Sequence, residues 1–253
     1  MAGPGRRRTA GRREQSDASG TTLPEVQVVR GVVATSALLT EQGIDALVLP
    51  VAPPADGDDD VQPRTGTADA AARYGLDLGD LAERIEASGS AGEARTVHLP
   101  RATGTDATLP WDGLPRRLVL VGIGAGTPAD LRRAGAAIAR STRGLRRVVT
   151  TVGGESGVDG TRALVEGYLL GAYRHPTRST DDAPPGPAEA LVLLGRHQES
   201  AVTAARVAAQ ATWTARVLTV TPSDTKNPAW LADRVTELAG ASGLTVEVLG
   251  PDE

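Results

Sequence analysis

The chain has 253 residues, of which 40% are hydrophobic and 23% are charged, and its formal net charge is −4. These values are typical of a soluble globular protein with one large domain or two modest ones. The absence of cysteine excludes disulfides, thiolate nucleophiles and cysteine-ligated zinc, and it favours a cytoplasmic location. Because no run of about 18 uncharged apolar residues is present, we expect no membrane-spanning segment.

Residues 1–23 form an arm that is rich in Arg, Gly and Ser and nearly free of apolar residues. This composition predicts disorder. No apolar segment follows its arginines, so the arm does not have the pattern of a secretory signal. Two interpretations remain open: a tail that binds an anionic partner, or a solvated extension.

Short apolar runs alternate with polar connections over residues 26–116. Strands are expected at 26–33, 46–51 and 95–100, the second being a buried parallel strand, and a helix is expected at 76–88. The connection 52–67 is rich in Pro, Gly and Asp. Its acidic cluster Asp58, Asp59 and Asp60 is either a cation site or, more simply, part of a solvated loop.

Residues 117–152 have the pattern of a β-α-β unit. The apolar run RLVLVGI at 117–123 predicts a buried strand, and a second strand is expected at 147–152. Between them, Thr127 is placed to cap a helix, with Pro128 and Asp130 in its first turn. Such a unit implies parallel strands joined by a right-handed crossover.

Three glycines, Gly122, Gly124 and Gly126, lie between the first strand of this unit and its helix. Backbone N–H groups at a helix N-terminus attract anions, so one interpretation is a phosphate-binding loop. However, Thr127 stands where the dinucleotide motif has its third glycine. The pattern therefore favours a tight strand-to-helix turn.

Further elements are expected towards the C-terminus, where a proline-rich break at 174–187 indicates a domain boundary. They are helices at 161–173, 198–216 and 230–241 and strands at 190–194 and 244–249. Alternating strands and helices place the chain in the α/β class. The three histidines, His98, His175 and His197, lie in separate elements without metal-ligand spacing, which favours surface or structural roles.

Two blocks together resemble the M17 family of leucyl aminopeptidases over about residues 26–250. The first extends from 118 to 178 and includes EGYLLGAYR at 166–174, which resembles the end of the N-terminal domain in that family. The second is ARVLTVTPSDTKNPAWLA at 215–232, which resembles the entry to the catalytic domain. Val217 and Val220 depart from the Asp and Asn that the family usually has at these positions.

The resemblance implies a metal-dependent exopeptidase that removes N-terminal amino acids from peptides. In that family two divalent metals, Mn or Zn, activate a water and polarise the scissile carbonyl. The ligands come from motifs such as Asn-Thr-Asp-Ala-Glu-Gly-Arg, which this sequence lacks, and Lys226, the only lysine, lies in the entry segment. We therefore assign no catalytic, cofactor-binding or metal-binding residue, and we expect the chain to be an inactive fragment without a cofactor of its own.

The resemblance also implies a domain organisation. We expect a disordered arm at 1–23, an N-terminal α/β domain with a macro-domain-like sheet at 24–180, a linker at 181–187, and a truncated α/β start of the catalytic domain at 188–253. Residues 24–180 should fold alone, and proteases should cut first at 174–187. The family implies a homo-oligomer, a hexamer, when the catalytic domain is complete. Alternative functions are a non-catalytic assembly or DNA-binding module, or a domain that binds nucleotide or ADP-ribose.

Overall fold

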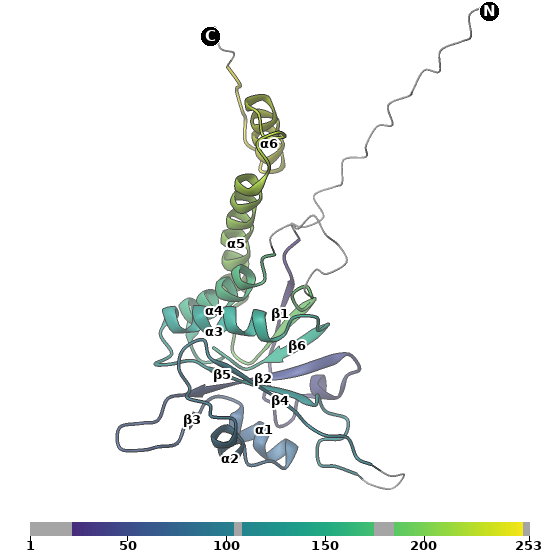
Figure 1. Cartoon of the computed structure of the whole chain (residues 1–253), viewed down its shortest axis with the longest axis vertical. Coiled ribbons are helices and arrows are strands. Elements are labelled where there is room, and N and C mark those ends of the chain that lie inside the picture. Colours follow the sequence, from purple (N-terminus) through teal and green to yellow (C-terminus); the bar gives the residue numbers. More distant parts are fainter. Residues whose placement is uncertain (1–21, 104–107, 175–184, 250–253) are drawn as a thin grey trace, which may run out of the picture.

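A mixed β-sheet covered by helices on both faces forms the centre of the computed structural model (Figure 1), which describes residues 22–103, 108–174 and 185–249. The strands are β1 (Glu25–Val29), β2 (Ile44–Ala52), β3 (Gln62–Pro63), β4 (Ala94–His98), β5 (Arg117–Gly122), β6 (Arg147–Thr150) and β7 (Ala190–Leu194). The helices are α1 (Thr67–Tyr74), α2 (Leu78–Arg84), α3 (Pro128–Ser141), α4 (Gly157–Gly171), α5 (Glu199–Val220) and α6 (Pro228–Ala241), with a 3-10 turn at Ala37–Thr40.

The strand order is β1-β7-β6-β2-β5-β4, and β3 pairs with the end of β2. Five neighbouring strands, β1, β7, β6, β2 and β5, are parallel, whereas β4 and β3 are antiparallel to their partners. The expected α/β class with a mixed sheet is therefore confirmed. The predicted β-α-β unit is β5-α3-β6, and β2 lies between its two strands.

Strand side chains alternate between two apolar cores, as expected for a sheet that is covered on both faces. In β2, Ala46 and Val48 face the core beneath α3, α4 and α5, whereas Leu47 and Leu49 face the core beneath α1 and α2. The two helical layers lie on opposite sides of the sheet in Figure 1. Burial on both faces explains why these strands are continuous apolar runs in the sequence.

The helices α3 and α4 pack so closely that side chains are excluded from their contact. A Cβ atom added to Gly167 would lie 2.0 Å from the backbone oxygen of Arg132, and one added to Gly135 would lie 2.1 Å from that of Leu164. Gly171 lies against Ala136 in the same way, at 2.9 Å from its Cα. The glycines of the EGYLLGAYR block therefore allow the two helix backbones to approach each other.

Residue 188, where a second unit is predicted to start, lies next to a strand of the same sheet. The strand expected there is β7, and it lies inside the sheet, paired in parallel with both β1 and β6. Of the expected linker 181–187, only residues 185–187 belong to the described residues. There, the Gly186 carbonyl oxygen accepts a hydrogen bond from the Gly144 backbone N–H. Among the described strands, β1 pairs with β7 alone. The first strand of the sheet is therefore joined to the others through the last strand.

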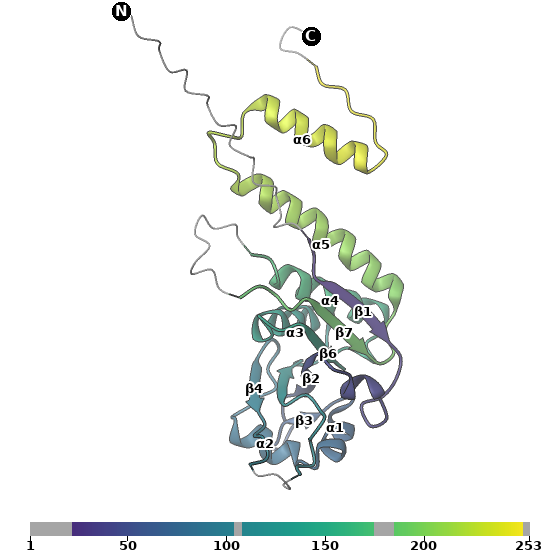
Figure 2. The same cartoon turned by 90° about the vertical axis from the view of Figure 1, so that its right-hand side faces the viewer.

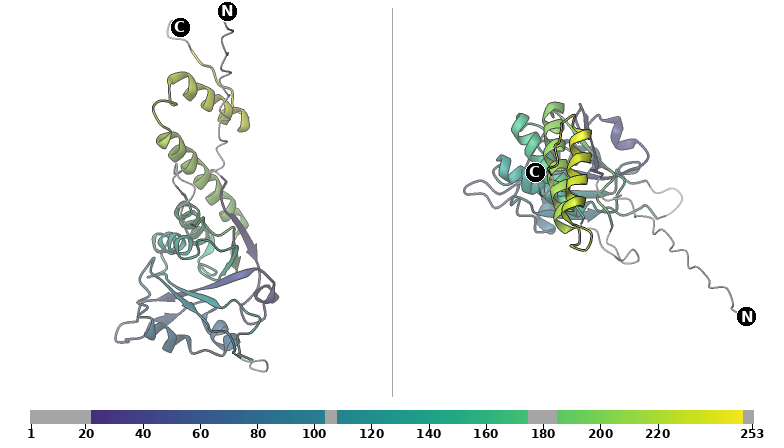
Figure 3. Two further views of the ribbon diagram at one scale, coloured as in Figure 1. Left: turned by 45° about the vertical axis from the view of Figure 1, so that its right-hand side comes forward. Right: turned by 90° about the horizontal axis from the view of Figure 1, so that it is seen from above.

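The helix α5 leaves the sheet and carries α6 away from it (Figure 2). Its buried residues end at Trp213, and α6 buries only Ala239 among its described side chains. The two views of Figure 3 show α6 lying across the far end of α5. The prediction of a strand at 244–249 is wrong, because this segment has no regular structure and pairs with none of the described strands.

The bounds of other elements also differ from the prediction. The strand expected at 26–33 ends at Val29, and the helix expected at 76–88 is the shorter α2, which Asp77 caps by accepting hydrogen bonds from the Gly79 and Asp80 backbone N–H groups. Neither α1 nor β3 is expected from the sequence pattern. Within the described residues, none of the helices has the length and apolar character that a membrane crossing requires.

Candidate functional site

The turn with Gly122, Gly124 and Gly126 is a structural turn. The N–H groups of these glycines donate to the carbonyl oxygens of Glu93, Gly89 and Ile123 respectively. A Cβ atom added to Gly122 would collide with the neighbouring loop, because it would lie 2.0 Å from the Ser90 oxygen, whereas one added to Gly126 would meet no atom within 4 Å. The following helix is capped by its own residues, because Thr127 and Asp130 form a reciprocal capping box. The N–H groups of the three glycines are thus already bonded within the protein.

The acidic cluster Asp58, Asp59 and Asp60 lies on the exposed connection between β2 and β3. The Asp58 carboxylate accepts a hydrogen bond from the Asp60 N–H at 3.4 Å, and no other described side chain holds the three in a fixed frame. Of the two interpretations, a cation site and a solvated loop, this arrangement agrees with the solvated loop.

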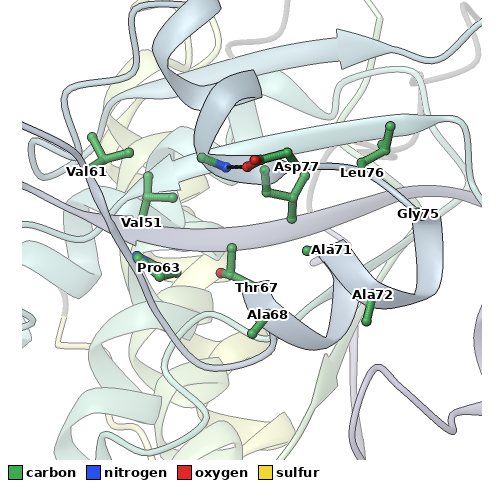
Figure 4. Close-up of a pocket in the computed structure, with 12 residues that line it drawn as sticks. Val51, Val61, Pro63, Thr67, Ala68, Ala71, Ala72, Gly75, Leu76 and Asp77 are labelled. Atoms are coloured by element: carbon green, nitrogen blue, oxygen red, sulfur yellow. Dashed lines mark hydrogen bonds between the residues drawn. The ribbon is translucent and has the colours of Figure 1, made fainter.

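An apolar hollow lies between β2, β3, α1 and the start of α2, with a volume of about 500 Å³ (Figure 4). Its polar side chains already have partners. The Thr67 hydroxyl donates to the Pro50 carbonyl oxygen, and the Asp77 carboxylate caps α2, as the dashed line in Figure 4 marks. This hollow therefore offers apolar contact area and no free acid or base.

The histidines have different environments. His98 is exposed on the edge strand β4, and His175 lies outside the described residues. His197 follows β7 and is buried, with only 5% of its surface exposed, and neither ring nitrogen has a hydrogen-bond partner. Burial lowers the pKa of the His197 imidazole to about 4, so the ring is neutral at pH 7. The sequence pattern placed this residue among surface or structural histidines and did not single it out.

Charged residues of the two blocks hold helices together. The Glu166 carboxylate of α4 bridges Arg132 of α3, at 2.6 Å, and Arg162, at 2.8 Å. Partial burial raises the pKa of Glu166, but the hydrogen bonds from both arginines outweigh this effect and hold it below its usual value. Lys226 donates to the carbonyl oxygens of Leu218 and Thr219 and so binds the C-terminal end of α5.

Metal binding requires several ligand side chains around one point. In the parts of the chain that the structure describes, no three His, Asp or Glu side chains lie close enough together to hold a metal ion. These residues do not fit a two-metal centre, and we assign no catalytic step to them.

Comparison with known proteins identifies relatives that match most of this chain. Residues 48–180 match the family model described as the cytosol aminopeptidase family, N-terminal domain. A probable cytosol aminopeptidase of Rhodococcus opacus (strain B4) is 34% identical over 218 residues, which are 81% of this chain and 40% of the relative. One from Mycobacterium marinum is 34% identical over 248 residues, or 91% of this chain and 44% of that protein.

Solved structures of similar proteins agree with the sequence relatives. The bottromycin maturation enzyme BotP has a TM-score of 0.57 at 26% identity, over 80% of this chain and 38% of its own. A mutant of tomato leucine aminopeptidase has a TM-score of 0.62 at 16% identity, over 88% of this chain and 44% of its own, and this likeness concerns the fold alone. The chain thus spans about two fifths of the length of the proteins it matches.

Proposed function

Because this chain belongs to the cytosol aminopeptidase family M17, we propose that it forms the N-terminal, non-catalytic part of a metal-dependent aminopeptidase. The observation that carries the proposal is the match of residues 48–180 to the N-terminal domain of that family. This span includes the second part of the central strand β2, the strands β5 and β6, and the closely packed α3 and α4. The complete enzyme would remove N-terminal amino acids from peptides.

The chemistry is proposed to lie in the remainder of the relatives' length, beyond the two fifths that this chain spans. A bound pair of divalent metals would activate water and polarise the scissile carbonyl there. BotP, which is similar in fold, has been determined in complex with Mn, which supports metal use among these relatives. The described residues supply no ligand set, so the chain alone is proposed to be inactive.

The proposed domain organisation follows the sheet. Residues 24–221 form the N-terminal unit, which includes β7 and α5, and the segment from Pro222 onwards is the entry to the catalytic domain. Assembly into a homo-oligomer, a hexamer by resemblance to the family, and a cytoplasmic location belong to the same proposal.

Hydrolysis of leucine p-nitroanilide by the purified chain tests this function. The assay is run with added Mn or Zn and with EDTA as the control, next to the full-length Rhodococcus opacus relative. We expect metal-dependent turnover only with the relative. EDTA-sensitive turnover that follows this chain through successive chromatographic steps would show that it holds a complete catalytic centre, and the proposal would be wrong.

A further inference from the structure

The apolar hollow of Figure 4 adjoins a second hollow, of about 810 Å³, which lies between the connection at 58–64 and the helix α2. Val61, Pro63, Asp77 and Gly79 line both hollows, so the two form one groove, named here the α2 groove. The first end of the α2 groove is apolar, and its second end is acidic.

Small side chains leave the apolar end open. Ala68, Ala71 and Ala72 of α1 line it and have the spacing of one helix face. Figure 4 shows them along α1, with Val61 and Pro63 on the segment that leads into β3. The alanines have no atoms beyond Cβ, so a volume of about 500 Å³ between α1 and α2 stays unfilled. An apolar side chain that enters this volume is held there by the hydrophobic effect.

Acidic side chains dominate the second end. Seven of its thirteen lining residues are Asp or Glu, and Arg64 is the one basic residue among them. The acids come from two segments: the connection at 58–60, and α2 with its continuation, where Asp80, Glu83 and Glu86 recur every third residue and so share a face. Among the described residues, only Asp80 of these acids forms an ion pair. The excess of negative charge is concentrated by the concave surface.

The positions of the acids suit several cationic groups rather than one. In the described parts of the chain, no three acidic or histidine side chains lie close enough together to hold a metal ion, so the carboxylates are spread along the groove. Cationic groups that follow one another along a chain meet such carboxylates one by one. A polyamine has such groups, but it leaves the adjoining apolar end empty. A peptide with Arg or Lys next to an apolar side chain occupies both ends.

We propose that the α2 groove docks an extended peptide segment of a partner protein, in which a Leu- or Val-sized residue lies beside two or more Arg or Lys residues. The apolar side chain lies against Val61 and Ala71, and the basic side chains face the connection at 58–60 and Glu83. Charge complementarity determines the sign of the partner, and the apolar end determines which part of the segment binds. This surface does not depend on the proposed peptidase role.

Fluorescence anisotropy with synthetic peptides tests the proposal on the full chain. The probe is labelled Arg-Arg-Leu-Leu-Arg-Arg with both ends blocked, and it is compared with Arg-Arg-Ser-Ser-Arg-Arg and Glu-Glu-Leu-Leu-Glu-Glu. We expect saturable binding of the probe, roughly tenfold or weaker binding of the serine peptide because it has no apolar side chain to bury, and no binding of the acidic peptide. Probe binding should also weaken as salt is added, because salt screens exposed charges.

Two variants, each with a matched control, assign the binding to the groove. Glu83→Lys reverses a charge at the acidic end and should weaken probe binding roughly fivefold or more, whereas Asp233→Lys, at an exposed position of α6, should not. Ala72→Gln fills the apolar end and should weaken binding of the probe but not of the serine peptide, and Ala211→Gln on α5 is its control. Because Glu83 and Ala72 are exposed helix positions, both variants should keep the thermal midpoint of the wild type.

Four results would overturn the proposal. One is the absence of saturable probe binding up to about 1 mM. Another is equal binding of the probe and the serine peptide, since the apolar end would then take no part. The third is probe binding that Glu83→Lys and Ala72→Gln both leave unaltered. The fourth is displacement of the probe by an equal or lower concentration of a peptide with the sequence of residues 1–21, since the occupant would then be the arginine-rich arm of this chain and not a partner.

Discussion

Single glycines determine how closely α3 and α4 approach, and they explain part of the EGYLLGAYR block in physical terms. Gly167 faces the backbone of Arg132 and Gly171 faces Ala136, so larger residues at these positions would separate the helices. The Glu166 carboxylate then joins the same two helices through Arg132 and Arg162. The block is thus a helix-packing motif, and its residues carry no chemistry that we can assign.

The first prediction concerns Gly167→Ala. The new methyl group would lie 2.0 Å from the Arg132 oxygen, so the helices must separate, and we expect the free energy of unfolding to fall by about 1–3 kcal/mol. Urea denaturation followed by circular dichroism measures this change. Gly240→Ala is the control: it also lies within a helix but has no atom within 4 Å of the added Cβ, so it should be neutral or stabilising.

The second prediction concerns the pH dependence that Glu166 confers. Its pKa in the folded protein lies below the usual 4.5, so its stabilisation is present above about pH 4.5 and is lost as the pH falls through the folded-state pKa. At pH 7, Glu166→Gln should lower the free energy of unfolding by about 1 kcal/mol. As the pH falls through the folded-state pKa, the stability of the wild type should approach that of the variant.

Urea titrations at several pH values compare this variant with Glu41→Gln, which removes an exposed pair with Arg147. The control should show a smaller loss at pH 7, because its carboxylate is more exposed than that of Glu166. A difference between Glu166→Gln and wild type that stays constant from pH 7 to pH 3.5 would show that the charge of Glu166 has no part in stability.

At the level of elements, the N-terminal part of α5 packs against the rest of the protein, whereas its C-terminal end does not. The Trp213 indole N–H donates to the Leu169 carbonyl oxygen, and its ring packs edge-on against Tyr173 at 5.3 Å. Arg216 lies over the same Tyr173 ring and donates to Leu170. These contacts supply donors to carbonyl oxygens near the C-terminal end of α4, which accept no hydrogen bond from within that helix. Beyond them, no described residue of α5 is buried.

The third prediction concerns α6. Leu231, Val235 and Leu238 form a stripe on one face of this helix, and each is 43% exposed. A 14-residue helix that buries a single described side chain is marginal in water. Hydrogen exchange measured by mass spectrometry should therefore show rapid exchange in α6 and strong protection in α4. Equal protection of the two helices would mean that α6 packs against a surface, in this chain or in a second copy.

At the level of the whole molecule, one sheet joins the first and the last of the described strands. The edge strand β1 contacts the rest of the sheet only through β7, and Arg206 of α5 donates to the Pro24 carbonyl oxygen. A unit that ended at residue 180 would lose β7, expose the edge of β6 and leave β1 without a partner.

The fourth prediction follows from this topology. A chain of residues 22–180 should lose the cooperative unfolding transition, because five fully buried residues of β7 and the partner of β1 are removed. A chain of residues 22–224, which keeps α5, should retain a transition close to that of the full chain. Thermal unfolding followed by circular dichroism distinguishes them. A sharp transition for residues 22–180 would contradict this prediction and support a domain boundary in the proline-rich stretch at 174–187.

Local signals in the sequence were sufficient for most elements. Apolar runs predicted the buried strands β2, β5, β6 and β7, and Thr127, Pro128 and Asp130 predicted the start of α3 with its capping box. The missing third glycine of the phosphate motif favoured a tight turn at Gly122–Gly126, and the structure has a turn there. These features depend on residues close together in the chain, where propensity, capping and side-chain period act directly.

The sequence by itself determined the α/β class, the order of the main elements and the resemblance to the M17 family. Only the tertiary structure placed β7 between β1 and β6, left residues 244–249 without a strand partner, and joined the acidic connection at 58–60 to α2 in one groove. Strand pairing and the burial of His197 depend on contacts between residues far apart in the chain. No local pattern specifies them, since many pairings satisfy the same apolar periodicity and only the packed sheet selects one.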